Sequence, residues 1–172
     1  MTDAEEGLRG NQFEAYFQKI PHILSSFSGV VAINQIPENI PVRHFIICNL
    51  SENHLPGSHW TVIVRPSKNT LEIFNSLGQE NFDYFMPYLK LKKTIQINFN
   101  KVAFQSATSK YCGFFCIYFV VFRILNFDMS MKHVLEDIFY SSDLIKNDKI
   151  VSEFCNNLLT STNDDFFSFH DF

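Results

Sequence analysis

Four polar residues, His59, Asn75, Gln105 and Cys112, could together carry out nucleophilic catalysis by a cysteine. Such catalysis needs a thiol, a base that accepts its proton, a group that orients the base, and a donor for the oxyanion. Each of these residues adjoins an apolar run, where a strand or a helix would hold it in place. The residue types and their order therefore predict a cysteine-dependent hydrolase.

Cys112 is the predicted nucleophile because it begins the run 112–125, which is apolar on almost every side and predicts an enclosed helix. A sulfur at the N-terminus of a helix faces unpaired N–H groups, which favour the thiolate and lower the pKa of the thiol. The alternative role is that of a small core hydrophobe, the usual fate of a free cysteine. Cys116, one helical turn deeper, is expected to be buried and inert.

His59 is the predicted general base, because it opens a strand-like run after a turn and should face a cleft at the edge of the sheet. Asn75 ends the partner strand of a hairpin, where its amide could accept from the imidazole N–H; its alternative role is an ordinary turn residue. Gln105 could donate to the oxyanion together with the backbone N–H of Cys112. Its alternative is an exposed glutamine in a loop.

A zinc site is the less favoured use of the same region. Its ligands would be Cys112, Cys116, His54 and His59. Structural zinc cysteines usually lie closer together and in loops, whereas these two are expected on one helix. We therefore expect no metal ion and no other cofactor.

The composition is that of a globular protein, with 172 residues, 46% hydrophobic residues and a formal net charge of -4 at pH 7. One domain is expected at this length, and the acidic balance argues against a grip on nucleic acid through its phosphates. No hydrophobic signal region opens the chain, and the longest apolar stretch, 113–121, is too short for a membrane span. We therefore expect an intracellular monomer whose four cysteines are reduced.

The pattern along the chain predicts an α+β fold, with a central mixed sheet and a buried helix that carries Cys112 at its N-terminus. Residues 1–10 are expected to form a flexible leader, 11–162 a single catalytic domain, and 163–172 an acidic-aromatic tail. Strands are expected over 44–48, 59–65, 70–74, 94–99 and 102–104. Helices are expected over 12–28 with a break at Pro21, and over 81–89, 112–125, 130–139 and 142–159.

These residues, in this order, resemble the adenovirus protease (adenain) family and its relatives, which include SUMO-specific proteases and proteases of large DNA transposons. The shared motifs are Pro-Gly-Ser-His59-Trp60, the strand ending Ile-Phe-Asn75-Ser-Leu-Gly, and Gln105-x6-Cys112-Gly-Phe-Phe-Cys116. The spacing from Gln105 to Cys112 is similar to that of adenain, whereas SUMO proteases have one residue fewer. The resemblance spans about residues 28 to 125.

The resemblance implies a cysteine-protease domain with a papain-like catalytic group in permuted order. His59 would be the base, Asn75 the orienting residue, Cys112 the nucleophile and Gln105 the oxyanion donor. The first function it implies is an endopeptidase that processes viral or mobile-element proteins through an acyl-enzyme thioester. The alternatives are an isopeptidase that removes ubiquitin or a ubiquitin-like modifier, and a catalytically dead relative that binds a protein partner.

The chain departs from the family in two respects. The family usually carries Asp or Glu at the position of Asn75, and an amide orients His59 without adding charge; papain-type proteases use Asn, so we expect a working enzyme. Adenain is activated by DNA and by a disulfide-linked peptide. The corresponding stretch 92–96 holds no cysteine and the net charge is acidic, so neither activator is expected; the expected partner is a polypeptide substrate.

Overall fold

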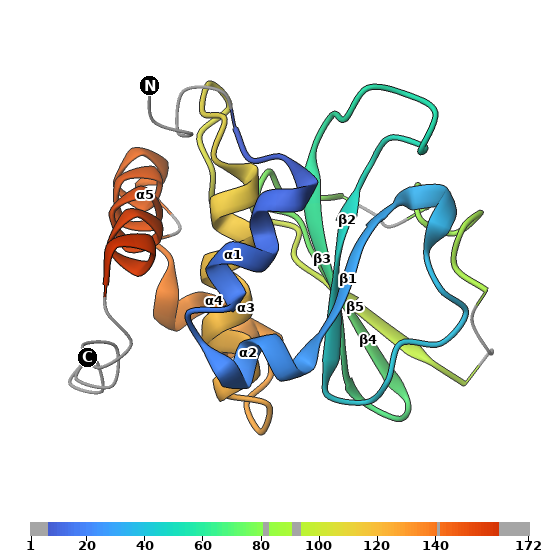
Figure 1. The fold of residues 1–172 in the computed structure, drawn as a ribbon. Helices are drawn as coiled ribbons and strands as arrows, with labels where there is room; N and C mark the ends of the chain where they lie inside the picture. Colours follow the sequence, from blue (N-terminus) through green and yellow to red (C-terminus); the bar gives the residue numbers. More distant parts are fainter. Residues whose placement is uncertain (1–6, 81–82, 91–93, 141, 162–172) are drawn as a thin grey trace.

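A five-stranded mixed sheet forms the centre of the molecule, and the helices lie on one of its faces (Figure 1). The computed structural model describes residues 7–80, 83–90, 94–140 and 142–161. The strands are β1 (Phe27–Ala32), β2 (His44–Asn49), β3 (Trp60–Ser67), β4 (Thr70–Phe74) and β5 (Gln96–Phe99). They lie in the sheet in chain order, with β2, β3 and β4 antiparallel and with β1 and β5 each parallel to its neighbour. The predicted α+β class with a mixed sheet is confirmed.

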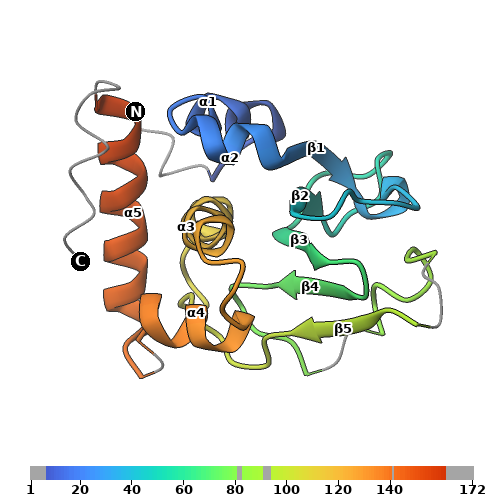
Figure 2. The ribbon, with the colours of Figure 1, turned by 90° about the horizontal axis from the view of Figure 1, so that it is seen from below.

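The helices surround a single central one, α3 (Cys112–Leu125), as Figure 2 shows from below. The others are α1 (Phe13–Phe17), α2 (Pro21–Ser26), α4 (Met131–Ile138) and α5 (Leu144–Thr160), with two short 3-10 turns, η2 (Gly10–Gln12) and η3 (Ile33–Gln35). Nearly every residue of α3 is buried, so the predicted enclosed helix is confirmed. Within the described ranges, no helix has both the length and the apolar character needed to cross a membrane.

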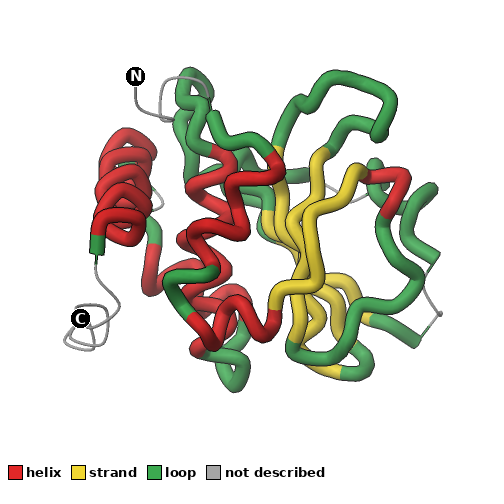
Figure 3. The backbone as a smooth tube through the Cα atoms, in the orientation of Figure 1, coloured by secondary structure: helices red, strands yellow, loops and turns green. Residues whose placement is uncertain are grey.

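Both faces of the sheet are covered, which explains why β2 and β3 contain continuous apolar runs rather than alternating ones. In β2, Phe45 and Ile47 join the core beneath the helices, whereas Ile46 and Cys48 join a second core on the opposite face. The opposite face is covered mainly by loops, drawn in green in Figure 3, together with the short 3-10 turn η3. Side chains alternate between the faces because a strand has a period of two residues.

Two predicted elements are wrong, and one strand was not predicted. The helix expected over 81–89 is wrong: residues 83–88 form turns, and residues 81–82 lie outside the described residues. Pro87 has no N–H to donate, which accounts for the missing helical ladder. The strand expected over 102–104 is also wrong, because the N–H of Phe104 bonds to a turn, at Ser76 O, and not to a strand. Strand β1 was not predicted; Phe27 was expected to lie in a helix.

The expected flexible leader is wrong for residues 7–10, while residues 1–6 and the tail 163–172 lie outside the described residues. Leu8 is only 6% exposed and belongs to the main core. Its carbonyl accepts a hydrogen bond of 2.8 Å from the indole N–H of Trp60. Residues 7–10 are therefore packed against the end of the sheet that carries His59.

A buried ion pair fixes α3 on the sheet. Arg123 donates from Nε and Nη2 to the two carboxylate oxygens of Glu72 on β4, at 2.7 and 3.0 Å. A further hydrogen bond of 2.7 Å runs from Arg123 Nη1 to the carbonyl of Asn126. Both charged side chains are almost fully buried. Two parallel bonds of this kind set the geometry as well as neutralising the charges.

Removing one partner of this pair should be costly. We expect Glu72→Ala to lower the free energy of unfolding by about 3–5 kcal/mol, because Arg123 is then left charged and buried without its partner. The exposed pair of Lys149 and Glu153 on α5 provides the matched control. Glu153→Ala should change stability by no more than about 0.5 kcal/mol. Urea denaturation measures both, and equal losses in the two variants would contradict a structural role for the buried pair.

Candidate functional site

A cavity of about 810 Å³ lies where α3 begins and β3 starts, and His59, Gln105 and Cys112 line it. Its other walls come from residues 7–10, from β1, and from the loops on either side of these three residues. Asn75 contacts His59 directly. The structure thus brings all four predicted residues together at one end of the sheet.

The tautomer of His59 is fixed by a backbone group. His59 Nε2 and Asn75 Oδ1 are 2.8 Å apart, and the same Oδ1 accepts the N–H of Leu77 at 3.0 Å. An N–H can only donate, so the atom facing Leu77 must be the amide oxygen, and the ring nitrogen bonded to this oxygen must carry a hydrogen. The neutral imidazole is therefore protonated at Nε2, which leaves Nδ1 as a proton acceptor.

Asn75 is itself held by a second asparagine that the sequence analysis missed. The backbone N–H of Asn75 donates to Asn100 Oδ1 at 2.9 Å, and Asn100 Nδ2 donates to the carbonyl of Asn75 at 2.7 Å. Asn100 is buried and lies directly after β5, so a polar residue closing an alternating, strand-like run was the available signal. This pair of bonds fixes the backbone that presents the Asn75 amide to His59.

Gln105 is only 3% exposed, so it is not the exposed loop residue considered as its alternative. Its Oε1 accepts from the hydroxyl of Ser76 at 2.6 Å, and its Nε2 donates to the carbonyl of Ser109 at 2.9 Å. The Ser109 carbonyl can only accept, so the nitrogen of the amide must face it. An amide nitrogen carries two hydrogens, which leaves one for a group in the cavity.

Gly78 lets the turn after Asn75 and the loop before Gln105 approach each other. It adopts a φ of +74°, and a Cβ built there would lie 2.6 Å from the carbonyl oxygen of Lys101 and 2.7 Å from the N of Ala103. Any other residue would push these backbones apart. The turn after Asn75 and the loop before Gln105 can therefore lie against each other only because residue 78 is glycine.

Cys112 lies partly buried at the first position of α3. Burial raises the pKa of its thiol above the ordinary value, while the backbone N–H groups of Trp60, Gly113 and Cys112 itself act in the opposite direction. The net direction differs from the lowering expected for a helix N-terminus, because desolvation of the sulfur outweighs these donors. Cys116 is fully buried with a pKa raised well above its ordinary value, as expected for an inert thiol.

The pKa of His59 is shifted in the complementary direction. Burial lowers it below 6.5, against the hydrogen bond to Asn75, which raises it. Both shifts have the same cause, since burial favours the uncharged form of the Cys112 thiol and of the His59 imidazole.

The zinc alternative has no matching geometry. Across the described part of the chain, no group of three or more His, Cys, Asp and Glu side chains lies close enough together to hold a metal ion. His54 is exposed and its Nδ1 lies 3.5 Å from Glu52.

In the stretch 92–96, residues 92 and 93 lie outside the described residues, and Gln96 begins β5.

No protein-family profile matches the chain, and no curated protein matches its sequence. The chemistry of the site therefore rests on its own residues and their geometry.

The lowered pKa of His59 predicts a loss of stability in acid. Between the unfolded value of about 6.5 and the lower folded value, the unfolded chain binds more protons, so the free energy of unfolding falls as the pH falls. We expect His59→Gln to reduce this loss between about pH 7.5 and 5, measured by urea denaturation. His22, which is exposed, is the control, and His22→Gln should keep the wild-type slope. If the free energy of unfolding of His59→Gln depended on pH as in the wild type, the loss of stability in acid would not come from His59.

Proposed function

We propose that this protein is a cysteine endopeptidase that hydrolyses peptide bonds through an acyl-enzyme thioester. The observation that carries the proposal is the fixed tautomer of His59. Asn75 Oδ1, which also accepts the N–H of Leu77, accepts a hydrogen bond from the N–H at His59 Nε2. The other ring nitrogen, Nδ1, is therefore free of hydrogen and can accept a proton. Cys112 and Gln105 line the same cavity as His59. A thiol, a base, an orienting group and an oxyanion donor are the four parts that the reaction needs.

In the first half of the reaction, His59 Nδ1 takes the thiol proton as the sulfur of Cys112 attacks the carbonyl carbon of the substrate. A C–S bond forms and the carbonyl oxygen becomes an oxyanion. The remaining hydrogen on Gln105 Nε2 and the backbone N–H of Cys112 donate to this oxygen. When the intermediate collapses, the C–N bond breaks and the leaving amine takes the proton from His59.

In the second half, water replaces the amine. His59 Nδ1 accepts a proton from the water as its oxygen attacks the thioester carbon, and the same donors stabilise the second oxyanion. The C–S bond then breaks, the sulfur of Cys112 leaves as thiolate, and the proton on His59 returns to it. The free acid is released, and the thiol and the neutral imidazole are restored.

The cavity has room for a segment of a polypeptide substrate. Its volume is about 810 Å³, and it is bounded by residues 7–10, β1 and two loops. Trp60 forms part of this wall, with its indole N–H held by the carbonyl of Leu8. By the resemblance to adenain, the substrates we propose are viral or mobile-element proteins, cleaved inside the cell by a monomeric enzyme without a cofactor.

Covalent labelling tests the nucleophile. A general peptidyl warhead for thiol proteases should modify Cys112, located by mass spectrometry, and Cys112→Ala should abolish both labelling and hydrolysis of a peptide library. Cys116→Ala is the matched control on the same helix and should keep both, because Cys116 is fully buried. Urea denaturation checks that both variants fold.

Each labelling pattern supports one function. Modification of Cys112 by the peptidyl warhead alone supports the endopeptidase. Modification by a vinyl sulfone of ubiquitin or of a ubiquitin-like protein would indicate the isopeptidase instead. Equal labelling of several cysteines, or none at Cys112, would refute an activated thiol and indicate a binding module.

Asn75→Asp should retain or raise the rate of hydrolysis. A carboxylate keeps the two contacts that Asn75 Oδ1 makes, with His59 Nε2 and with the N–H of Leu77. Its negative charge should raise the pKa of His59, which NMR titration of the ring measures directly. Asn75→Ala, which removes both contacts, is the control and should lose most of the activity. Complete loss in Asn75→Asp would show that Asn75 is not the orienting residue.

A further inference from the structure

The backbone on either side of Gln105 is hydrogen-bonded to side chains of α5. We propose that Asn147 and Asp148 of this helix are positioning residues that hold the two peptide groups flanking the Cα of Gln105. They thereby aim its amide at the oxyanion. The inference rests on the proposed function, because it concerns the same reaction. It adds a helix that carries none of the four predicted catalytic residues.

Asn147 holds the peptide group on the N-terminal side of Gln105. Its Nδ2 donates to the carbonyl of Phe104 at 3.0 Å, while the N–H of Gln105 in the same peptide group donates to the carbonyl of Ser76 at 3.0 Å. Asn147 also exchanges two hydrogen bonds with the backbone of Tyr140, at 2.7 and 2.9 Å. With three bonds made by one side chain that is 1% exposed, Asn147 is locked in a single orientation.

Asp148 holds the peptide group on the C-terminal side. Its Oδ1 accepts the backbone N–H of Ser106 at 3.3 Å, and its Oδ2 accepts the hydroxyl of the same residue in a short hydrogen bond. Asp148 is 8% exposed. Burying a carboxylate is costly unless its oxygens receive hydrogen bonds, so this contact favours one position of residue 106. The peptide groups before and after Gln105 are thus both tied to α5.

This arrangement leaves the Gln105 side chain little freedom. Its peptide groups are fixed by Asn147 and Asp148, and its amide by Ser76 and Ser109. An oxyanion donor is effective only when it is held in place before the charge develops. Displacement of a catalytic group by about 1 Å can cost on the order of 10²-fold in rate. Loss of the Asp148 contact should therefore slow the chemical step and leave substrate binding almost unchanged.

A double-mutant cycle tests the inference. Gln105→Ala should lower kcat by roughly 10²–10³-fold, the effect of losing one oxyanion donor. Asp148→Ala should lower kcat by about 10- to 100-fold with KM changed by no more than about twofold. Because Asp148 acts through Gln105, the double variant should be no slower than Gln105→Ala alone. Alkylation of Cys112 by iodoacetamide forms no oxyanion, so its rate should be the same in wild type and in Asp148→Ala.

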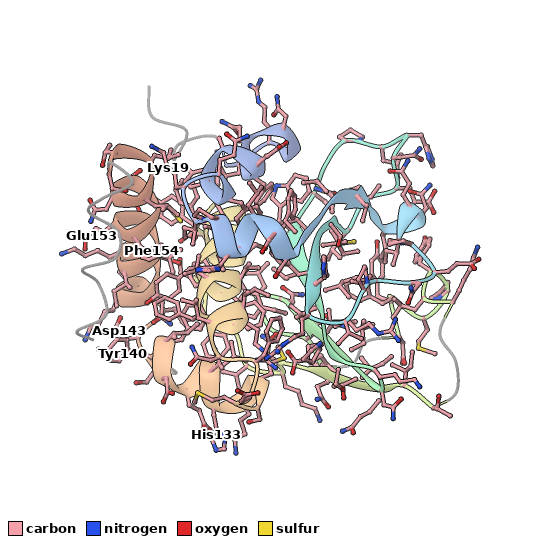
Figure 4. The ribbon with its side chains drawn as sticks, turned by 60° about the horizontal axis from the view of Figure 1, so that its bottom comes forward. Lys19, His133, Tyr140, Asp143, Glu153 and Phe154 are labelled. Carbon is pink, nitrogen blue, oxygen red and sulfur yellow. The ribbon has the colours of Figure 1, made fainter. Side chains whose placement is uncertain are left out.

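Two further variants keep the test decisive. Ser106→Ala removes only the hydroxyl contact and should show the same kcat effect in a milder form, even where Asp148→Ala fails to fold. Asp148→Asn keeps an oxygen for the N–H of Ser106 and should restore most of the rate. Glu153→Ala is the control on the same helix, since Figure 4 shows Glu153 on the outer side of α5, where its carboxylate reaches Lys149. It should behave as wild type.

The outcomes separate the two proposals. Losses of kcat that multiply in the double variant, or a slowed alkylation of Cys112 in Asp148→Ala, would overturn the positioning role while hydrolysis by the wild type upholds the endopeptidase. Absence of hydrolysis and of labelling at Cys112 in the wild type would overturn the proposed function, and the positioning role with it.

Discussion

The packing of α3 against the sheet is the constraint on which the rest of the structure depends. The helix is buried along almost its whole length, and the ion pair between Arg123 and Glu72 fixes its position along β4. Cys112 stands at the other end of this helix and lines the same cavity as His59 and Trp60, where β3 begins. Because β3 and β4 are antiparallel, the residue before β3 and the residue after β4 lie at the same end of the sheet. One rigid contact between helix and sheet therefore places Cys112 near His59 and Asn75.

Asparagine side chains hold the loops that regular structure leaves open. Loops carry backbone N–H and C=O groups that a sheet ladder does not satisfy, and buried groups of this kind need partners. Asn49 Oδ1 accepts the N–H groups of Ser51 and Ser58, which shapes the loop before His59. Asn100 and Asn147 do the same for the segments around Asn75 and Gln105. An amide both donates and accepts, so one residue can satisfy two backbone groups without burying a charge.

Burial shifts the pKa values of Cys112 and His59 toward their uncharged forms. The same enclosure that positions Cys112 and His59 removes water from them, raising the pKa of the thiol and lowering that of the imidazole. Asn75 orients the ring without adding a charge to oppose this effect. In the proposed reaction, these shifts favour transfer of the thiol proton to His59 during the attack over a preformed thiolate.

The sequence by itself determined the elements whose signal is local. The apolar run from Cys112 predicted α3, the strand-like runs predicted β2, β3 and β4, and the placement of polar residues at the ends of these runs predicted the residues that now line or adjoin the cavity. Only the tertiary structure decided the tautomer of His59, the direction of the Cys112 pKa, and the roles of Asn100, Asn147 and Asp148. These depend on hydrogen bonds and burial between segments far apart in the chain, such as the one from Asn147 to Phe104. Residue type and local periodicity do not predict which distant backbone group a side chain will hydrogen-bond to.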